Sequence, residues 1–232
     1  MAPPVCRVQW RPSFRIVSSR FPPVGLFDKV ARADDLDAIY YLEGLTNPRL
    51  LEEMGKLDRV PAGRRVCGPG TTPIMAAFTH VTPGGSRFSD GTFGVYYAAC
   101  DRPTAVAETM HHRTRFLAST AQPACVLEMR CYVGDLAASL HDIRGGYPGL
   151  HDPDSYQASQ AEAIKLRAAG SDGIVYDSVR LPGGQCAALF YPDLMQPVRQ
   201  ESHLYYHWTG THFSHVVVAG EVILPPQWGQ AN

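Results

Sequence analysis

The sequence predicts an α+β protein, a strand-rich sheet with peripheral helices. Three observations lead to this class. Several segments alternate apolar and polar residues with period two, a few segments between them have helical periodicity, and turn signals separate the two kinds. Hydrophobic residues make up 45% of the 232 residues and charged ones 19%, which suits a folded core. At about 150 residues per domain this length allows one large domain or two small ones. Since no repeat or linker interrupts the chain, we expect a single domain over residues 1–232.

The first third of the chain predicts one strand and two helices. Residues 6–19 are aromatic and β-branched and are followed by two prolines, which is typical of a strand. A helix is predicted at residues 34–45, because the apolar residues there are spaced near the helical period. Two aspartates stand at its start, where the helix dipole favours acidic side chains. Thr72 as N-cap and Pro73 at the first helical position predict a second helix through Phe78.

The middle of the chain predicts a strand followed by a helix. After the turn at Asp90-Gly91, period-two spacing places four side chains on one face of a strand: Phe93, Val95, Tyr97 and Ala99. Residues 104–116 have apolar side chains at core-facing helical intervals and carry Glu108.

The remaining third predicts strands with one further helix. Residues 125–133 alternate as a strand, and Ser159 with Glu162 form a capping box that opens a helix closed by Gly170. Three more strands are expected at residues 173–180, 185–191 and 216–224, the last bent at residues 219–220.

Charge and composition exclude several classes of function. Lys+Arg 21 against Asp+Glu 22 gives a net charge of −1, which argues against direct nucleic-acid binding by bulk electrostatics. No apolar run approaches the roughly 18 residues of a membrane span, and the N-terminus lacks the features of a signal peptide. The six cysteines form no C-x-x-C pair, so we expect reduced, mostly buried thiols in a cytoplasmic protein that binds no membrane.

The most informative stretch runs from Ser86 to the helix that holds Glu108. It places Arg87 on a turn, Tyr97 on a strand and Glu108 on the following helix, close enough in the chain to converge on one cleft. Farther on, the strand predicted at residues 173–180 carries Ser178 on the face shared with its neighbours Tyr176 and Arg180.

These residues resemble those of a known family. Arg87, Glu108 and Ser178 are similar to the three residues that name the RES domain family, toxins of bacterial toxin-antitoxin pairs, and Glu108 follows Tyr97 by eleven positions. Phe14-Arg15-Ile16 resembles the family's early arginine motif.

The resemblance covers about residues 15–197. Residues 34–80 look like a helical extension of one branch of the family, and residues 198–232 form a C-terminal segment with aromatics, histidines and a hairpin. Ser86-Arg87-Phe88 stands where many members have Gly-Arg-Trp, which keeps an aromatic and alters the shape of the expected nicotinamide pocket.

The resemblance implies a fold similar to the ADP-ribosyltransferases, NAD as substrate and no metal. It implies cleavage of the nicotinamide–ribose bond by hydrolysis or phosphorolysis, or else transfer of ADP-ribose to a protein. It also implies a cognate antitoxin, an Xre-like helix-turn-helix protein that blocks the active site. A binding module without catalysis is the alternative of a different class.

The chemistry can also be argued from the residue types. Breaking the nicotinamide–ribose bond develops oxocarbenium character on the ribose, so we expect the Glu108 carboxylate to stabilise the transition state. Arg15 and Arg87 would grip the diphosphate, because a planar guanidinium binds phosphate oxygens in pairs. Tyr97 would stack on nicotinamide, and Ser178 would orient a ribose hydroxyl, the carboxylate or the nicotinamide amide.

Each assignment has a simpler alternative. Arg87 taken alone could form a surface ion pair with Asp90, and Glu108 could be an ordinary helix acid beside His111 and His112. Tyr97 could belong to the core. A metal site among four C-terminal histidines is disfavoured, because the segment has loop signals and lacks an H-E-x-x-H motif: His203, His207, His212 and His215. Residues 68–72 could bind an anion at a helix start or serve as a plain turn.

Overall fold

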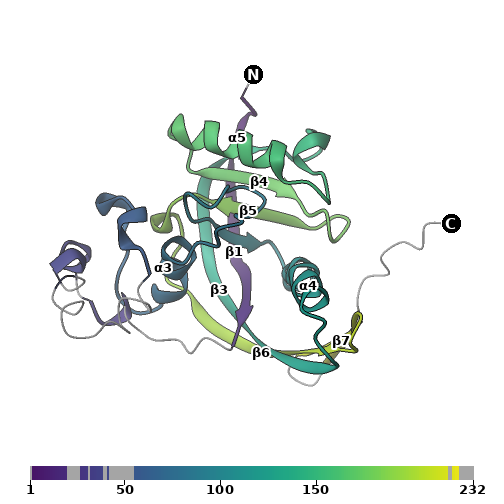
Figure 1. Ribbon diagram of the computed structural model, residues 1–232. Helices are drawn as coiled ribbons and strands as arrows, with labels where there is room; N and C mark the ends of the chain where they lie inside the picture. The colour runs from purple at the N-terminus through teal and green to yellow at the C-terminus, as the bar shows by residue number, and fades with distance from the viewer. Residues whose placement is uncertain are drawn as a thin grey trace.

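An eight-stranded sheet forms the centre of the computed structural model, which describes residues 2–19, 27–30, 32–38, 41, 55–218 and 221–224 (Figure 1). Its strands are β1 (Val5–Ser18), β2 (Tyr96–Ala99), β3 (Cys125–Asp142), β4 (Gly173–Asp177), β5 (Gln185–Leu189), β6 (Arg199–Trp208), β7 (Phe213–Val218) and β8 (Glu221–Ile223). The described helices are α3 (Thr72–Thr79), α4 (Arg102–Ser119) and α5 (Gln157–Ala168), with short 3₁₀ turns at Phe27–Lys29, Ala33–Asp35, Leu57–Arg59, Ala62–Arg64, Pro148–Leu150 and Pro192–Leu194.

Five of the strands close into a ring. The sheet order is β1-β2-β5-β4-β3-β6-β7-β8, and β1 also pairs with β3. All pairs are antiparallel except β3 with β4. Strand β3 is long enough to serve three partners, because its first half pairs with β6, its last two residues pair with β4, and β1 runs along its other edge. This closure brings β1, at the start of the chain, beside β2.

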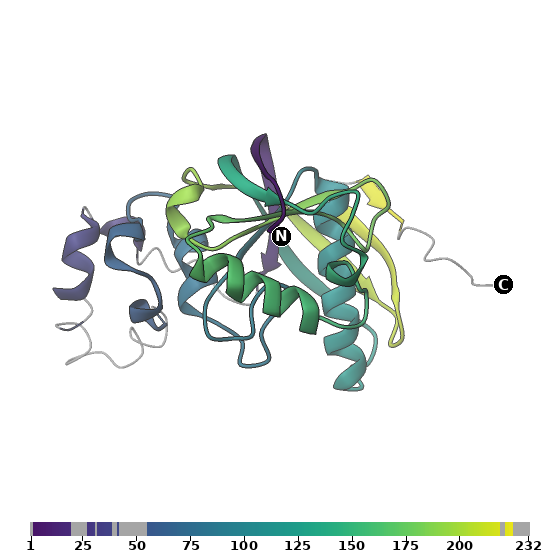
Figure 2. The same cartoon turned by 90° about the horizontal axis from the view of Figure 1, so that it is seen from above.

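Two apolar clusters lie on the two faces of this sheet. One contains side chains of α4 and α5, including Val106 and Leu166, and the other contains side chains of α3, including Phe78. Helices α3 and α4 accordingly lie on opposite sides of the central strands (Figure 1). Figure 2 shows residues 27–38 and 55–64 gathered near α3 and away from α4. None of the helices in the described ranges is long and apolar enough to cross a membrane.

The predicted α+β class, with a strand-rich sheet and peripheral helices, is confirmed. The strand predicted at residues 6–19 and the helix predicted at residues 104–116 both form, the helix with Asp101 as its N-cap. The strand predicted at residues 125–133 continues to Asp142, because β1 pairs along its second half. Strand β2 starts only at Tyr96.

The shared face predicted before α4 is present although the strand is short. Phe93, Val95 and Ala99 are buried in the cluster beneath α4, and Tyr97 packs against it. Tyr96 and Ala98 point to the other cluster. All six cysteines are free thiols, of which two are buried and four partly buried.

Two predicted helix caps are wrong. Helix α5 begins at Gln157, so Ser159 lies inside its first turn, where the buried hydroxyl donates to the Tyr156 carbonyl over 3.0 Å instead of capping. Helix α3 has Thr71 at the N-cap, and the Thr72 hydroxyl donates to the carboxylate of Asp28 over 2.7 Å. In both places the hydroxyl donates a hydrogen bond to another partner, which is a local carbonyl for Ser159 and a distant carboxylate for Thr72.

Two strand predictions are corrected as well. The strand predicted at residues 173–180 ends at Asp177, because the next residues turn. In place of one bent strand at residues 216–224, residues 216–218 belong to β7 and residues 221–223 form β8, and the two strands are antiparallel. The bend at residues 219–220 lies outside the described residues, as does most of the helix predicted at residues 34–45. The part of that helix that is described begins with the 3₁₀ turn Ala33–Asp35.

Candidate functional site

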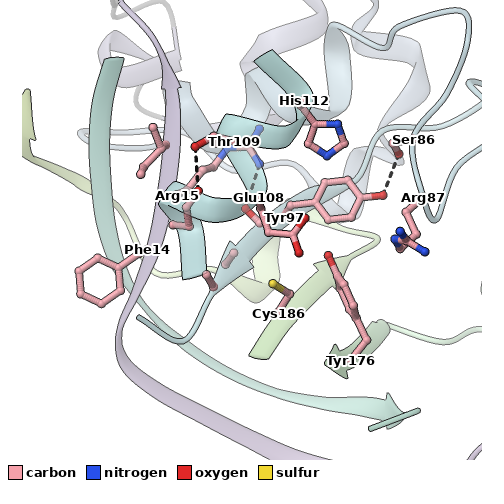
Figure 3. A pocket seen from close by; sticks show the side chains of 14 residues that line it. Phe14, Arg15, Ser86, Arg87, Tyr97, Glu108, Thr109, His112, Tyr176 and Cys186 are labelled. Carbon is pink, nitrogen blue, oxygen red and sulfur yellow. Dashed lines mark hydrogen bonds between the residues drawn. The ribbon is translucent and has the colours of Figure 1, made fainter. Parts of the chain in front are cut away.

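A cavity of about 180 Å³ opens between α4 and the ring of strands (Figure 3). Residues of β1, β2, α4, β4, β5 and the turn before β2 line it: Phe14, Arg15, Ile16, Ser86, Arg87, Tyr97, Ala98, Ala99, Ala105, Glu108, Thr109, His112, Tyr176 and Cys186. Four of the five candidate residues from the sequence thus line one cavity. The fifth, Ser178, contacts one of those four directly.

Glu108 and Ser178 form the hydrogen-bonded pair of the site. The Ser178 hydroxyl donates to Oε1 of Glu108 over 2.6 Å. The oxygen of the Ser178 hydroxyl in turn accepts hydrogen bonds from the backbone amides of Arg180 and Leu181, each over 3.1 Å. Since a serine hydroxyl has one hydrogen and two lone pairs, these amides use the lone pairs and leave the hydrogen for the carboxylate.

The predicted place of Ser178 on a strand face is therefore wrong. Ser178 lies in the turn that follows β4, and this turn fixes its hydroxyl. Burial raises the pKa of the Glu108 carboxyl, while the Ser178 hydroxyl and then Arg87 and Arg180 lower it in part. The carboxylate is thus poorly solvated and held by few partners.

Tyr97 is held by two hydrogen bonds at its hydroxyl. Its hydroxyl lies 2.7 Å from the Ser86 hydroxyl and accepts the amide of Phe88 over 2.9 Å. Figure 3 shows this hydroxyl directed toward Ser86 and Arg87. Burial raises the pKa of the Tyr97 phenol to about 12, so it stays neutral at physiological pH.

Arg87 lies on a tight turn closed by the bridge between Ser86 and Ser89, with Gly85 at φ 71° immediately before it. A Cβ on Gly85 would lie 2.2 Å from the Ser89 carbonyl oxygen, so the turn requires glycine. The Arg87 side chain is buried and donates to the carbonyls of Leu150 over 3.3 Å and Asp152 over 2.8 Å.

The surroundings of Arg87 exclude the simple surface reading. Its guanidinium lies 4.6 Å from the centroid of the Tyr156 ring, while Asp90 is exposed and binds Thr92 instead. Phe88, which stands where many RES members have Trp, is fully buried with its ring 4.8 Å from that of Tyr176. Phe88 therefore supports the cavity wall from behind.

Arg15 reaches the cavity from β1, a strand that only the ring closure brings to β2. Its Nη1 donates to the Tyr97 carbonyl over 3.0 Å, and its guanidinium lies 4.5 Å from the centroid of the Tyr96 ring. Its Nε is buried and has no hydrogen-bond partner among the residues that the structure describes. Burial lowers the pKa of Arg15, and no ion pair in the described part of the chain involves Arg15 or Arg87.

Sequence reasoning missed two residues of the site. Arg180 is buried and donates to the Pro153 carbonyl, and its charge acts on Glu108. His112 lines the cavity one helical turn after Glu108 and is in part open to solvent. Burial and then Arg180 and Arg87 lower the pKa of His112 to about 4, so it is neutral at pH 7. The i+4 spacing from Glu108 was the available signal for His112.

The charges of the site do not balance within the protein. Two guanidinium groups, Arg87 and Arg180, act on the carboxylate of Glu108, and a third, Arg15, belongs to the cavity lining. Their hydrogen bonds go to neutral backbone carbonyls. A cavity with uncompensated, weakly hydrated cations suits an anionic ligand such as a phosphate ester.

The other candidate segments serve structural roles where the structure describes them. His203 and His207 lie on strand β6, where i+4 spacing is no helical metal motif, and His207 stacks on His215 at 4.1 Å between centroids. The described residues hold no group of three or more potential metal-ligating side chains. At residues 68–72 the first helical amide donates to Asp28, and the Gly70 carbonyl accepts the amide of Val198. These contacts favour the plain turn.

Together the fold and the cavity define a class: an α+β protein with a partly buried carboxylate beside arginines. Residues 60–209 match the model of the RES domain. The chain is 30% identical over 228 residues to the uncharacterized protein y4oC of Sinorhizobium fredii, covering 94% of both chains. It therefore belongs to the RES domain family.

A solved structure is also similar. It is described as the crystal structure of the M. tuberculosis MbcT–MbcA toxin-antitoxin complex, and the likeness covers 55% of this chain and 74% of that chain. The TM-score is 0.40 and the sequence identity 14%.

Proposed function

We propose that this protein is the toxin of a bacterial toxin-antitoxin pair and that it consumes NAD by cleaving the nicotinamide–ribose bond. Membership of the RES domain family supports the toxin role. The observation that carries the reaction is the Ser178–Glu108 pair, a hydrogen-bonded carboxylate at the wall of a cavity whose other charged lining residues are Arg15 and Arg87.

Glu108 acts on the ribose in this proposal. As the bond from ribose C1′ to the nicotinamide nitrogen breaks, nicotinamide leaves with the bonding electron pair and positive charge develops on the ribose. A carboxylate about 4 Å away at a protein surface gains about 4 kcal/mol from that charge, which corresponds to about a thousandfold in rate. Ser178 holds the carboxylate in one orientation, so little reorganisation is needed during the reaction.

The cationic residues hold the rest of the substrate. Arg15 and Arg87 bind the diphosphate, and the flat ring of Tyr97 stacks against nicotinamide. The cavity volume of about 180 Å³ is below the roughly 300–1,000 Å³ of pockets for whole drug-sized ligands. It therefore receives the nicotinamide end, and the adenosine end lies outside it.

The acceptor can be water, phosphate or a protein side chain. Each ends with the ribose C1′ bonded to a new oxygen or nitrogen and one proton released to solvent. A toxin of this kind acts in the cytoplasm, where NAD is present, and requires an antitoxin that covers the cavity. We propose an Xre-like helix-turn-helix protein as that partner.

The decisive experiment incubates the pure protein with NAD labelled in the adenine ring and follows free nicotinamide, with and without phosphate and with a cell lysate. Nicotinamide release with label in free ADP-ribose or its phosphate supports the NAD-degrading toxin. Label on protein indicates the alternative, a protein ADP-ribosyltransferase using the same cavity. No release under any condition contradicts both enzymes and leaves a binding module.

A further inference from the structure

One loop holds two arginines of the cavity. The segment from residue 147 to residue 153 is part of the connection between β3 and α5. Its backbone carbonyls accept hydrogen bonds from the guanidinium groups of Arg87 and Arg180. Leu150 and Asp152 accept from Arg87, and Pro153 accepts from Arg180. Because neither arginine has an acidic partner in an ion pair within the described ranges, the position of this loop determines where both positive charges lie.

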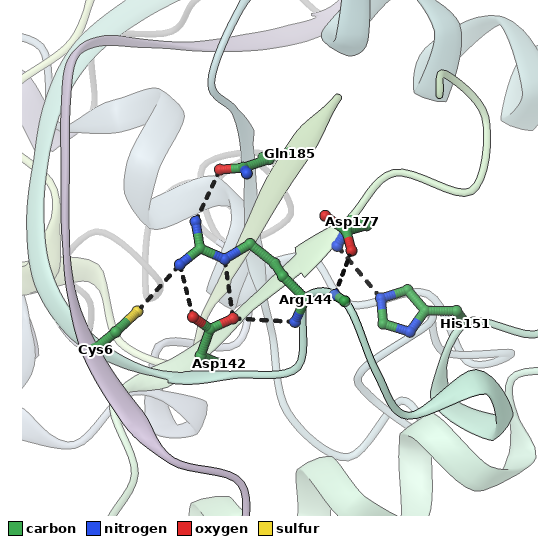
Figure 4. A network of polar contacts seen from close by, with 7 residues as sticks. Cys6, Asp142, Arg144, His151, Asp177 and Gln185 are labelled. Carbon is green, nitrogen blue, oxygen red and sulfur yellow. Dashed lines mark hydrogen bonds and ion pairs between the residues drawn. The ribbon is translucent and has the colours of Figure 1, made fainter. Parts of the chain in front are cut away.

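His151 lies in the middle of that loop and has a defined tautomer. Its Nδ1 lies 3.1 Å from the Tyr147 carbonyl, which can only accept a hydrogen bond, so Nδ1 carries the proton. Its Nε2 then has a free lone pair, and the amide of Asp177 donates to it over 3.3 Å (Figure 4). The imidazole thus bridges the loop to the end of β4.

Asp177 holds the same loop at a second point. Its carboxylate accepts the amide of Gly145 over 2.7 Å, just before the loop. The residue after Asp177 is Ser178, the hydrogen-bond partner of Glu108. One contact of the His151 ring therefore connects the arginine side of the cavity to the carboxylate side.

The two sides do not depend on His151 equally. Ser178 has its own supports, since its amide donates to the Gly184 carbonyl over 2.9 Å and its hydroxyl accepts two amides of its turn. Loss of the His151 contact leaves these hydrogen bonds in place. It removes the Asp177 contact nearest to the carbonyls that position Arg87 and Arg180, and it leaves the contact at Gly145, ahead of the loop.

We infer that His151 is a positioning residue that sets the two loop-bound arginines for the anionic part of the substrate. This inference rests on the proposed function. It differs from a role in catalysis, because His151 does not line the cavity. Its loss affects substrate binding more than the rate of bond cleavage.

Three substitutions of His151 distinguish the hydrogen bond of Nδ1 from that of Nε2. Gln reaches the position of Nε2 and can accept the Asp177 amide, Asn reaches only the position of Nδ1, and Phe keeps a flat ring without either nitrogen. For His151→Phe and His151→Asn we expect the KM for NAD to rise about fivefold, as for the loss of one ordinary hydrogen bond, with kcat within about twofold. His151→Gln should return KM to near the wild-type value. His203→Phe, an exposed histidine on β6, is the matched control.

A second measurement does not depend on activity. Amide hydrogen exchange of peptides covering residues 147–153 and 173–178 should be faster in His151→Phe and His151→Asn than in wild type, and near wild type in His151→Gln. If wild type releases nicotinamide and His151→Phe keeps both its KM and its exchange rates, the inference is overturned. If wild type releases none, the proposed function fails, and the exchange rates alone then decide whether His151 fixes the loop.

Discussion

The hydroxyl of Ser178 donates a 2.6 Å hydrogen bond to the carboxylate of Glu108, which lies seventy residues earlier in the chain. The turn after β4 fixes the serine, and α4 fixes the glutamate. Because two turn amides donate to the lone pairs of the serine oxygen, the single hydroxyl hydrogen is left for the carboxylate. The proposed reaction depends on this single orientation.

Glu108→Gln should lower the rate of nicotinamide release by about a thousandfold, because the neutral amide loses the attraction to the developing ribose charge. Burial raises the pKa of Glu108 in the folded protein, so its ionised form costs stability at neutral pH. The variant should therefore melt at the same temperature as wild type or higher at pH 7. Glu128→Gln, an exposed acid on β3, is the control, and a fully active Glu108→Gln would refute the role.

Ser178→Ala should shift the acidic limb of the rate profile to higher pH. The Ser178 hydroxyl lowers the pKa of Glu108, so removing it raises that pKa further and the reactive carboxylate forms only at higher pH. At pH 7 we expect a loss on the order of tenfold in kcat/KM. Ser178→Thr keeps a hydroxyl and should restore the wild-type limb. An unshifted limb in Ser178→Ala would show that the hydrogen bond does not influence the carboxylate.

Arg87→Lys should raise the KM for NAD about tenfold or more. A lysine ammonium keeps the charge but does not reproduce the planar guanidinium, whose Nη1 donates to the carbonyls of Leu150 and Asp152 and whose face lies over the Tyr156 ring. Steady-state kinetics with NAD check this, with Arg7→Lys on the exposed face of β1 as the control. Equal KM values in the two variants would mean that charge alone is sufficient.

Tyr97→Phe should lower the free energy of unfolding by about 1–3 kcal/mol, because the Phe88 amide loses its acceptor inside the protein. The ring remains, so we expect a smaller increase in KM for NAD than in Tyr97→Leu, which also removes the stacking surface. Chemical denaturation and kinetics together test both parts. Tyr205→Phe, whose side chain is 40% exposed on β6, should change neither quantity.

Acidification should destabilise the protein between about pH 6.5 and pH 4 through two histidines of α4. Burial, and after it Arg180, lower the pKa values of His111 and His112 to about 4, whereas an unfolded histidine titrates near 6.5. Within that window the unfolded chain binds protons that the folded protein does not, so stability falls as pH falls. Denaturation midpoints at pH 7 and pH 5 should differ less in His112→Gln than in wild type or in His203→Gln. An equal pH dependence in all three would contradict the prediction.

The local periodicity of the chain determined most of the elements and part of the site. Period-two alternation gave the shared face of Phe93, Val95, Tyr97 and Ala99, and helical spacing gave α4 with Glu108. These patterns can be read from the sequence because each depends on neighbours within a few positions. Among the predictions that failed, those at Ser159 and Thr72 are places where the hydroxyl donates to a nearby oxygen instead of capping the helix.

The tertiary structure alone decided how the site is assembled. The ring of strands brings Arg15 of β1 to the carbonyl of Tyr97, and the turn after β4 aims Ser178 at Glu108. Most of the partners that hold the arginines are backbone carbonyls of the loop that contains Leu150 and Asp152. Every residue type carries such a carbonyl, so no pattern of side chains in the sequence can mark which ones will accept, and only the folded chain selects them.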